Sequence, residues 1–288
     1  GLDTLIGIEN IIGSKYADTF RGDNTKSNTF NGGIASLLTP NIEASGDEND
    51  TVSYDELTQS TDKIEVNLIN GTVLINGAVT DNLINIEHVI GTSGNDTFIG
   101  NSDNNSLVGG AGNDTFKITT VANGNDVIEG DIANVNIGQR DTIDYSAING
   151  SYWLEANLTT NILRIMAPDG SDADLLADIV DQDAVYNIED IVGTANADTI
   201  TGNSSINILS GADGADDIDG AEGNDIIYGE TNINYFTNTS TTGAVSIGDV
   251  VEVGSTYYRA KVAQASVNFG TTNYASDTTN WEIYTSYG

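Results

Sequence analysis

A glycine-rich unit of nine residues recurs along the chain, and this period restricts the possible folds more than any other feature. In "GTSGNDTFIGNSDNNSLVGGAGNDTF", which runs from Gly91 to Phe116, each unit carries one large apolar residue at its eighth position. A second array in the same register runs from Gly193 to Gly229. A period of nine matches neither the 3.6-residue repeat of an α-helix nor an ordinary hairpin. The arrays therefore indicate a repeat architecture, in which neighbouring units bury one another's apolar side chains.

Each unit consists of a turn of six residues followed by a strand of three. Gly, Asn and Asp in the turn adopt left-handed and other uncommon backbone conformations at low steric cost. The residue at position eight points inward and its two neighbours point outward. These inward residues are Phe98, Leu107, Phe116, Ile200, Leu209, Ile218 and Ile227. Two units then form a coil of 18 residues, and stacked coils pair their strands in parallel.

Stacking places the acidic residue of each unit above its counterpart two units away. We expect Asp96 above Asp114, and Asp198 above Asp216. Carboxylates about 4.8 Å apart, the spacing of neighbouring strands, repel by roughly 1 kcal/mol in water and about 4 kcal/mol at an effective dielectric constant near 20. The chain also has 43 acidic and nine basic residues, for a formal charge of −34. A column of acids in such a chain requires a bridging cation.

Calcium suits these turns better than magnesium or zinc. Ca²⁺ accepts six to eight oxygen ligands in irregular geometry, whereas Mg²⁺ prefers a strict octahedron and retains its waters. Zn²⁺ prefers His or thiolate ligands, and the chain has one histidine and no cysteine. The predicted calcium-site residues, which glycine carbonyls complete, are Asp96, Asn105, Asp114, Asp198, Asn207, Asp216, Asp225, Gly91, Gly109, Gly193, Gly211 and Gly220. Looser units add Asp18, Asp50 and Asp126, where a polar turn without metal remains an equal alternative.

The unit "GGAGNDTFK", from Gly109 to Lys117, resembles the calcium-binding nonapeptide of the RTX, or hemolysin-type, proteins at every motif position. The phrases "IENIIG" and "NDTVSY" are similar to spacers of large RTX surface proteins and adhesins. The resemblance covers about residues 1–229. It implies a right-handed parallel β-roll that folds on binding calcium after secretion, usually by type I export from a Gram-negative bacterium. Asn105 and Asn207 depart from the motif, so weaker calcium binding is expected there.

Alternating segments separate the nonapeptide arrays and predict hairpins. Residues 63–77 and 153–166 alternate apolar and polar residues around a central Asn-Gly or Thr-Asn, a pattern typical of strand–turn–strand. Because no segment has helical periodicity over three turns, the predicted class is all-β. We predict a calcium-binding β-roll with hairpin and loop insertions over residues 1–230, a linker over 231–243 and a small β module over 244–288.

The predicted C-terminal module carries four prominent aromatic residues, Tyr257, Tyr258, Trp281 and Tyr284. Such side chains either form the core of a small module or present a flat platform to sugar rings or to a partner protein. The segment faintly resembles small chitin-binding-type and tail-fibre modules. Ligand binding by these four residues is therefore one interpretation, and a core role is the other.

Other features argue against several functional classes. The negative charge repels nucleic acids and anionic membranes, and no apolar run approaches the 18 residues of a membrane span. The sequence contains no phosphate loop, dinucleotide fingerprint or zinc motif. His88 lies in a spacer whose sister copies carry Asn10 and Asp190, so it is a poor candidate for a catalyst. We therefore expect no enzyme activity in these residues.

These observations lead to a structural hypothesis. The chain is expected to be a calcium-stapled segment of a secreted bacterial surface protein, an adhesin, a surface-layer component or an extracellular filament or matrix protein. Self-association or binding to other surface proteins is expected, and glycans are further candidate partners. Two alternatives remain: a glycan-binding module displayed on the roll, and the secretion and folding tail of an RTX enzyme.

Overall fold

The structure is a computed structural model of residues 1–288. It describes residues 9–14, 16–33, 49–131, 139–168 and 178–229, together with short strands between residues 236 and 284. Within these residues the chain forms 27 strands and no helix, which confirms the predicted all-β class. The described part accordingly contains no helix of the length and hydropathy needed to cross a membrane.

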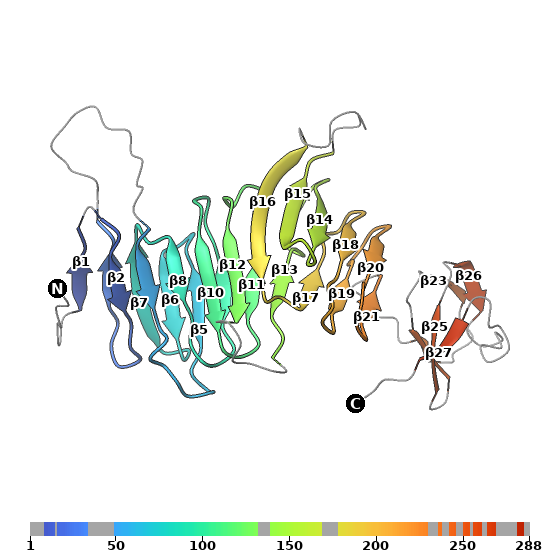
Figure 1. The fold of residues 1–288 in the computed structure, drawn as a ribbon, viewed down its shortest axis with the longest axis horizontal. Coiled ribbons are helices and arrows are strands. Elements are labelled where there is room, and N and C mark those ends of the chain that lie inside the picture. Colours follow the sequence, from blue (N-terminus) through green and yellow to red (C-terminus); the bar gives the residue numbers. More distant parts are fainter. Residues whose placement is uncertain are drawn as a thin grey trace.

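Two long sheets hold the first 21 strands, and successive strands fall in alternate sheets except at two insertions (Figure 1). The first sheet has the spatial order β1 (Asn10–Ile12), β3 (Thr29–Asn31), β7 (Val79–Ile84), β6 (Thr72–Ile75), β5 (Ile64–Asn67), β9 (Thr97–Ile99), β11 (Thr115–Lys117), β13 (Thr142–Asp144), β17 (Asp190–Val192), β19 (Ile208–Ser210) and β21 (Ile226–Tyr228). The second has the order β2 (Thr19–Arg21), β4 (Thr51–Ser53), β8 (His88–Ile90), β10 (Ser106–Gly110), β12 (Val127–Asp131), β16 (Ile179–Tyr186), β15 (Ile162–Met166), β14 (Trp153–Asn157), β18 (Thr199–Thr201) and β20 (Asp217–Asp219).

Parallel pairing between neighbouring coils has the predicted register. Phe98 of β9 pairs with Phe116 of β11 in the first sheet, 18 residues away. Leu107 of β10 lies in the second sheet, where it pairs with Val89 and Ile128. The inward position-eight residues of the first array are at most 1% exposed. The predicted coil of two units, with one strand in each sheet, is therefore confirmed.

The core lies between the two sheets and forms one continuous cluster. Phe20 of the second sheet stacks on Phe30 of the first, with ring centroids 5.5 Å apart, so the two sheets face each other across this cluster. Phe98 and Phe116 stack along the first sheet at 5.0 Å. Each such side chain contributes about 1.5–3 kcal/mol when it is fully buried, and no unit could bury its own apolar residue alone.

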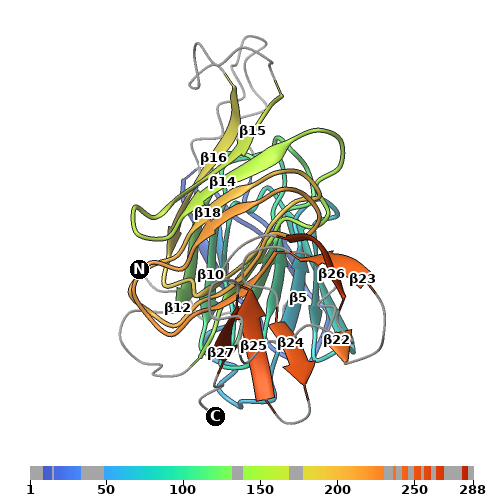
Figure 2. The same ribbon diagram turned by 90° about the vertical axis from the view of Figure 1, so that its right-hand side faces the viewer.

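Two antiparallel insertions interrupt the parallel stacking. β5, β6 and β7 form a three-stranded meander in the first sheet, and β14, β15 and β16 form a second one in the second sheet. The predicted hairpins over residues 63–77 and 153–166 are β5–β6 and β14–β15, but the third, returning strands β7 and β16 were not predicted. The eight-residue β16 extends beyond its neighbours in the stack (Figures 1 and 2).

The remaining strands lie C-terminal to the arrays. A four-stranded sheet has the order β22 (Phe236–Thr237), β24 (Val250–Val253), β25 (Thr256–Ala260) and β27 (Trp281–Tyr284), and β23 (Thr242–Val245) pairs with β26 (Gln264–Asn268). β22 and the first half of β23 fall within the range predicted as a linker, 231–243, and the domain division stays a prediction. One of the expected loop insertions, over residues 35–49 where the nonapeptide register is interrupted, lies almost wholly outside the described residues.

Candidate metal centre

Acidic side chains connect consecutive coils at the edge where the first sheet's strands begin. Asp114 Oδ1 accepts the backbone N–H of Asp96 at 2.7 Å, and Asp141 Oδ1 accepts that of Asp114 at 2.8 Å. Glu189 Oε2 continues the series by accepting the N–H of Asp141 at 3.0 Å. Each acid precedes a strand by one residue, so its short side chain reaches the backbone of the adjacent coil. The result is a column of charge-assisted hydrogen bonds along the stack.

The opposite edge carries an equivalent column. Its bonds run from the N–H of Asp18 to Asp50 Oδ1 (2.6 Å), Asn105 to Asp126 (2.8 Å), Asp126 to Asp183 (2.9 Å) and Asp198 to Asp216 (3.0 Å). The N–H of Asn207 donates to Asp225 Oδ1 at 2.9 Å on the first edge. The predicted stacking of these pairs is therefore present. Insertions lengthen the spacing from 18 residues to as many as 57 without breaking the bond pattern.

The turns of the repeats are of two kinds, which the sequence analysis did not distinguish. In the first kind the second residue caps the acid of its own turn: Thr92 donates its N–H to Asp96 Oδ2 at 2.6 Å and its Oγ1–H to Oδ1 at 3.1 Å. Thr194 donates to Asp198 in the same way, at 2.6 and 2.8 Å. Asn101 and Asn203 likewise donate their N–H groups to Asn105 and Asn207. The protein itself satisfies these side chains.

In the second kind of turn the second residue has a positive φ, as at Gly110 (+111°) and Ala212 (+67°). Gly110 belongs to the turn that ends at Asp114. Asp114 is 1% exposed, and its Oδ2 has no hydrogen-bond partner within the described ranges. The sequence signal is a second-position Gly or Ala in place of Thr or Asn. This turn leaves Asp114 Oδ2 available to a cation.

The first-position glycines are required by close contact with these carboxylates. A Cβ on Gly109 would stand 2.2 Å from Asp114 Oδ2 and 2.6 Å from the carbonyl oxygen of Gly130. A Cβ on Gly91, Gly193, Gly211 or Gly220 would stand 2.0–2.5 Å from an oxygen of Asp96, Asp198, Asp216 or Asp225, respectively. A side chain at these positions would displace the acid. At Gly91, Gly109 and Gly193 the glycine brings a carboxylate and a backbone carbonyl together, which is the donor set that Ca²⁺ takes, whereas at Gly211 and Gly220 only the carboxylate is this close.

Asp141 adds a second open carboxylate beside Asp114. It is fully buried, and its Oδ2 also lacks a hydrogen-bond partner among the described residues. Burial first, and then repulsion from neighbouring carboxylates, raise the pKa of Asp114 to about 8 and that of Asp141 to about 7. The Asp96 pKa rises only to about 6, since burial opposes hydrogen bonds from Thr92 and Ile64. Two buried, adjacent and partly unsatisfied carboxylates favour a divalent cation.

Several residues of the two columns were missed in the sequence analysis, namely Asp81, Glu87, Asp141, Asp183 and Glu189. Asp141 could have been found, because "RDTIDY" repeats the "NDTVSY" phrase that contains Asp50. Across the described part of the chain, no three His, Cys, Asp or Glu side chains are grouped as a metal site. A cation in the turns would therefore be held by carboxylates in pairs together with carbonyl oxygens.

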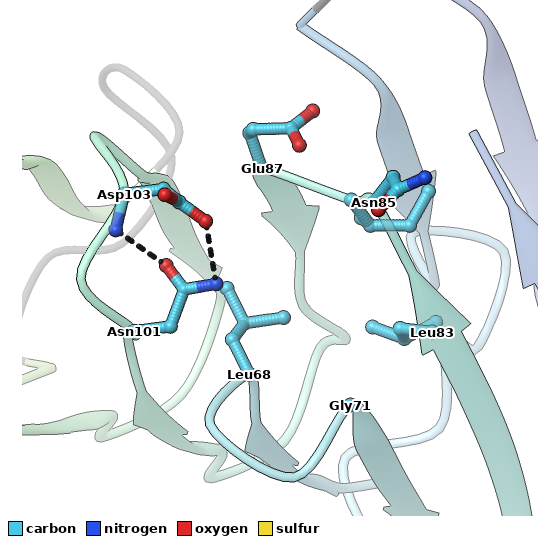
Figure 3. Close-up of a pocket in the computed structure, with 8 residues that line it drawn as sticks. Leu68, Gly71, Leu83, Asn85, Glu87, Asn101 and Asp103 are labelled. Atoms are coloured by element: carbon cyan, nitrogen blue, oxygen red, sulfur yellow. Dashed lines mark hydrogen bonds between the residues drawn. The ribbon is translucent and has the colours of Figure 1, made fainter. Parts of the chain in front are cut away.

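A small pocket of about 140 Å³ lies beside the first insertion. Asp103 and Asn101 line one side and Asn85 and Leu83 the other (Figure 3). Asn101 Nδ2 donates to Asp103 Oδ2 at 3.2 Å, and the Glu87 carboxylate accepts the N–H of Asp50 at 3.1 Å. The polar walls of this pocket are thus already engaged in hydrogen bonds within the protein.

The predicted ligand residues of the C-terminal module are described only through their backbone. Tyr257 pairs with Tyr284 in the antiparallel register of β25 and β27, and Tyr258 pairs with Ile283. Trp281 pairs with Ala260. Ligand binding by this module stays a prediction.

Comparison with known protein families identifies the repeats. Residues 85–116 and 190–230 match the RTX calcium-binding nonapeptide repeat, in four copies. The chain therefore carries RTX repeats, and RTX nonapeptide repeats bind calcium ions. Proteins with these repeats are typically exported from Gram-negative bacteria by type I secretion. No curated protein matched the chain.

Proposed function

We propose that this RTX-repeat chain is a rigid, calcium-stapled segment of a secreted bacterial surface or matrix protein, with a structural role and no catalytic one. The observation that carries the proposal is the column of acids that joins coil to coil on both edges of the stack. Binding modules display a local site, whereas these bonds are distributed along the whole repeat region. A distributed set of contacts is what a load-transmitting spacer requires.

The acidic residues explain why such a segment would respond to calcium. Buried carboxylates such as Asp114 and Asp141 destabilise the stack when they are ionised and unpaired. Bound Ca²⁺ supplies the compensating charge at the open turns, so metal binding contributes free energy of folding. Extracellular calcium modules bind with dissociation constants of about 10⁻⁴–10⁻³ M. The chain would then stay unfolded in the cytosol and fold after export.

The test measures the fold and the shape of the whole chain with and without calcium. Circular dichroism in chelator is expected to show a largely unfolded chain that gains β signal on adding Ca²⁺. Small-angle scattering should then report a rod, and electron microscopy should reveal whether rods associate end to end or with other surface proteins. A spectrum and a scattering curve that do not respond to chelator or calcium would contradict the proposal.

Glycan binding by the C-terminal strands is the second candidate function. It is favoured by the register that sets Tyr257 opposite Tyr284 on neighbouring strands, since paired aromatic residues are common in sugar sites. A glycan array probed with the full chain, with Tyr257→Ala and Trp281→Ala as controls, distinguishes the candidates. Binding that both substitutions abolish supports a glycan-binding module, and calcium-dependent rods without glycan binding support the spacer.

A further inference from the structure

We propose a second kind of divalent-cation site, outside the matched repeats, formed by Asn123, Asp126 and Asp181 where the second insertion meets the stack. Asn123 and Asp126 lie in the turn before β12, and Asp181 lies on β16, the strand that pairs with β12. The matched RTX segments end at residue 116 and resume at residue 190, so the site lies outside the matched repeats. Asp126 belongs to one of the looser units of the sequence analysis, and Asp181 belongs to no unit.

Contacts bring the three residues together through Asn123. Its Nδ2 donates to Asp126 Oδ2 at 3.1 Å, and its backbone N–H lies against the Asp181 carboxylate. Asn123 is 3% exposed, Asp126 1% and Asp181 4%. The three side chains are therefore held in one buried, oxygen-rich space.

Two oxygen atoms in this space lack a donor. Asn123 Oδ1 and Asp181 Oδ2 are buried and accept no hydrogen bond from any described residue. A buried acceptor without a partner costs about 1–3 kcal/mol, and more when it is charged, so native structures rarely retain one. Rotating the Asn123 amide by a half turn would set Oδ1 beside Asp126 Oδ2, and a cation bound between the two oxygens would stabilise this arrangement.

Asp183 is close by but is not needed as a ligand. Its Oδ1 accepts the N–H of Asp126 at 2.9 Å, and its Oδ2 accepts the Tyr145 hydroxyl at 3.3 Å. The proposed site therefore contains two carboxylates and one amide oxygen, which agrees with the lack of any three-acid group in the described ranges.

The first insertion provides an internal control, because it has the same hydrogen bonds between insertion and stack but lacks acidic counterparts of Asp126 and Asp181. Asn28 donates its N–H to Asp81 Oδ1 at 2.7 Å, as Asp126 does to Asp183, and Tyr54 donates to Asp81 Oδ2 at 2.9 Å, as Tyr145 does to Asp183. The segments "VTDNLINIE" and "DQDAVYNIE" align these strands.

In this alignment the three site residues have neutral counterparts. Thr25 corresponds to Asn123, Asn28 to Asp126 and Val79 to Asp181. The Tyr–Asp pair is common to both insertions and therefore belongs to the hydrogen bonds that they share. The two further acids occur only in the second insertion, so the fold of an insertion does not require them.

Calcium is the cation that suits this site. The three side chains supply carboxylate and amide oxygens in irregular positions, which Ca²⁺ accepts and completes with backbone carbonyls or waters, whereas Mg²⁺ requires a near-ideal octahedron. A cation here would tie β16 to the turn before β12 and hold the second insertion on the stack. It would do so independently of the nonapeptide turns.

The test counts Ca²⁺ ions bound to the full chain by equilibrium dialysis and isothermal titration. Asp181→Asn removes one charge with little change of shape, and Asp181→Val copies Val79 of the first insertion. Each is expected to bind one Ca²⁺ fewer than the wild type, and in chelator Asp181→Val should refold at a lower concentration of trimethylamine N-oxide than the wild type. Asp114→Asn, in the RTX array, serves as the matched control and should lose an ion independently.

The double variant Asp114→Asn/Asp181→Asn should show the sum of the two losses. Wild-type stoichiometry in both Asp181 variants, with a loss in Asp114→Asn, overturns this site but leaves calcium binding by the array intact. A loss in the Asp181 variants but not in Asp114→Asn supports the site and removes support from the array instead. Circular dichroism in calcium confirms that each variant is folded. If Asp181→Asn does not fold, Asp181→Val still tests the site.

Discussion

Replacing Asp114 by Asn should stabilise the fold in chelator, and this advantage should disappear in calcium. The substitution retains the oxygen that accepts the N–H of Asp96 and removes the buried negative charge. Asn207 shows that an amide can occupy the same position of a unit: its oxygen accepts the N–H of Asn203 at 2.9 Å, and its Nδ2 donates to the Glu189 carbonyl at 2.8 Å.

The size of the effect in chelator follows from the pKa of the wild-type residue. Burial raises the pKa of Asp114 to about 8, against about 3.9 in an unfolded chain. At pH 7 the carboxyl group is ionised in the unfolded state and must take up a proton on folding. The cost of this proton corresponds to the difference of about three units between pH 7 and the unfolded-state pKa of about 3.9. At about 1.4 kcal/mol per unit, this lowers the free energy of unfolding by about 4 kcal/mol. Asp114→Asn should recover about 2–4 kcal/mol of it, because its new N–H₂ group also requires a partner.

In calcium the variant should lose its advantage. A ligand at 100 times its dissociation constant stabilises the folded state by about 2.7 kcal/mol, and Asp114→Asn removes a charged oxygen from the site and with it most of this gain. The loss of about 2.7 kcal/mol offsets the gain of about 2–4 kcal/mol, so the stabilities of variant and wild type should lie within about 1 kcal/mol of each other in saturating Ca²⁺. The two media separate the electrostatic cost of the acid from its use as a ligand.

Urea unfolding followed by circular dichroism measures both values, in saturating calcium and in chelator. Because the calcium-free chain is expected to be largely unfolded, trimethylamine N-oxide, which strengthens burial, refolds it for every urea measurement in chelator. Asp217→Asn is the matched control, since Asp217 is exposed on β20 of the same repeat region and its substitution removes one charge without touching a column. The reasoning fails if Asp114→Asn is destabilising in chelator, or if Asp217→Asn shows the same dependence on calcium.

Three further predictions concern the same region. In chelator, the free energy of unfolding should fall as the pH rises from about 5 to about 8, because the folded-state pKa values of Asp114 and Asp141 lie above their unfolded values. The stability that these two carboxyl groups contribute is complete only below pH about 4 and is lost as the pH rises through about 7 to 8. Urea titrations at a series of pH values test this, and calcium should abolish or reverse the trend, because protons compete with the metal. Gly109→Ala should cost about 3 kcal/mol or more in calcium, since its Cβ would stand 2.2 Å from a carboxylate oxygen; an unchanged melting temperature would contradict the close contact. Tyr54→Phe should destabilise the fold by about 1–3 kcal/mol, because it removes the 2.9 Å bond to the buried Asp81, and a neutral effect in urea unfolding would show that this bond contributes nothing.

Much of the repeat geometry could be predicted because it depends on local backbone alternation. Position-eight residues such as Phe98 and Ile200 are buried in the core where a three-residue strand follows a six-residue turn. Ile218 and Ile227, in the last two units of the stack, are only partly buried. The stacking of Asp198 on Asp216 follows from the same count, as does the use of both edges. The chemistry of the turns was predicted only in part. Thr92 and Gly110 occupy the same position of a unit, but Thr92 hydrogen-bonds to the acid of its turn, whereas Gly110 leaves one carboxylate oxygen of Asp114 without a partner among the described residues.

The nine-residue period by itself determined that this protein stacks short parallel strands, buries one apolar residue per unit and lines its turns with acids. Only the tertiary structure decided that the insertions return through a third strand, that one joins each sheet, and that Asp81 and Asp183 become fully enclosed partners of Tyr54 and Tyr145. The physical reason is the range of the interactions. Whether a side chain points into the core or toward solvent is set within its own unit. The pairing of Asp126 with Asp183, 57 residues away, depends instead on where an entire insertion rejoins the stack.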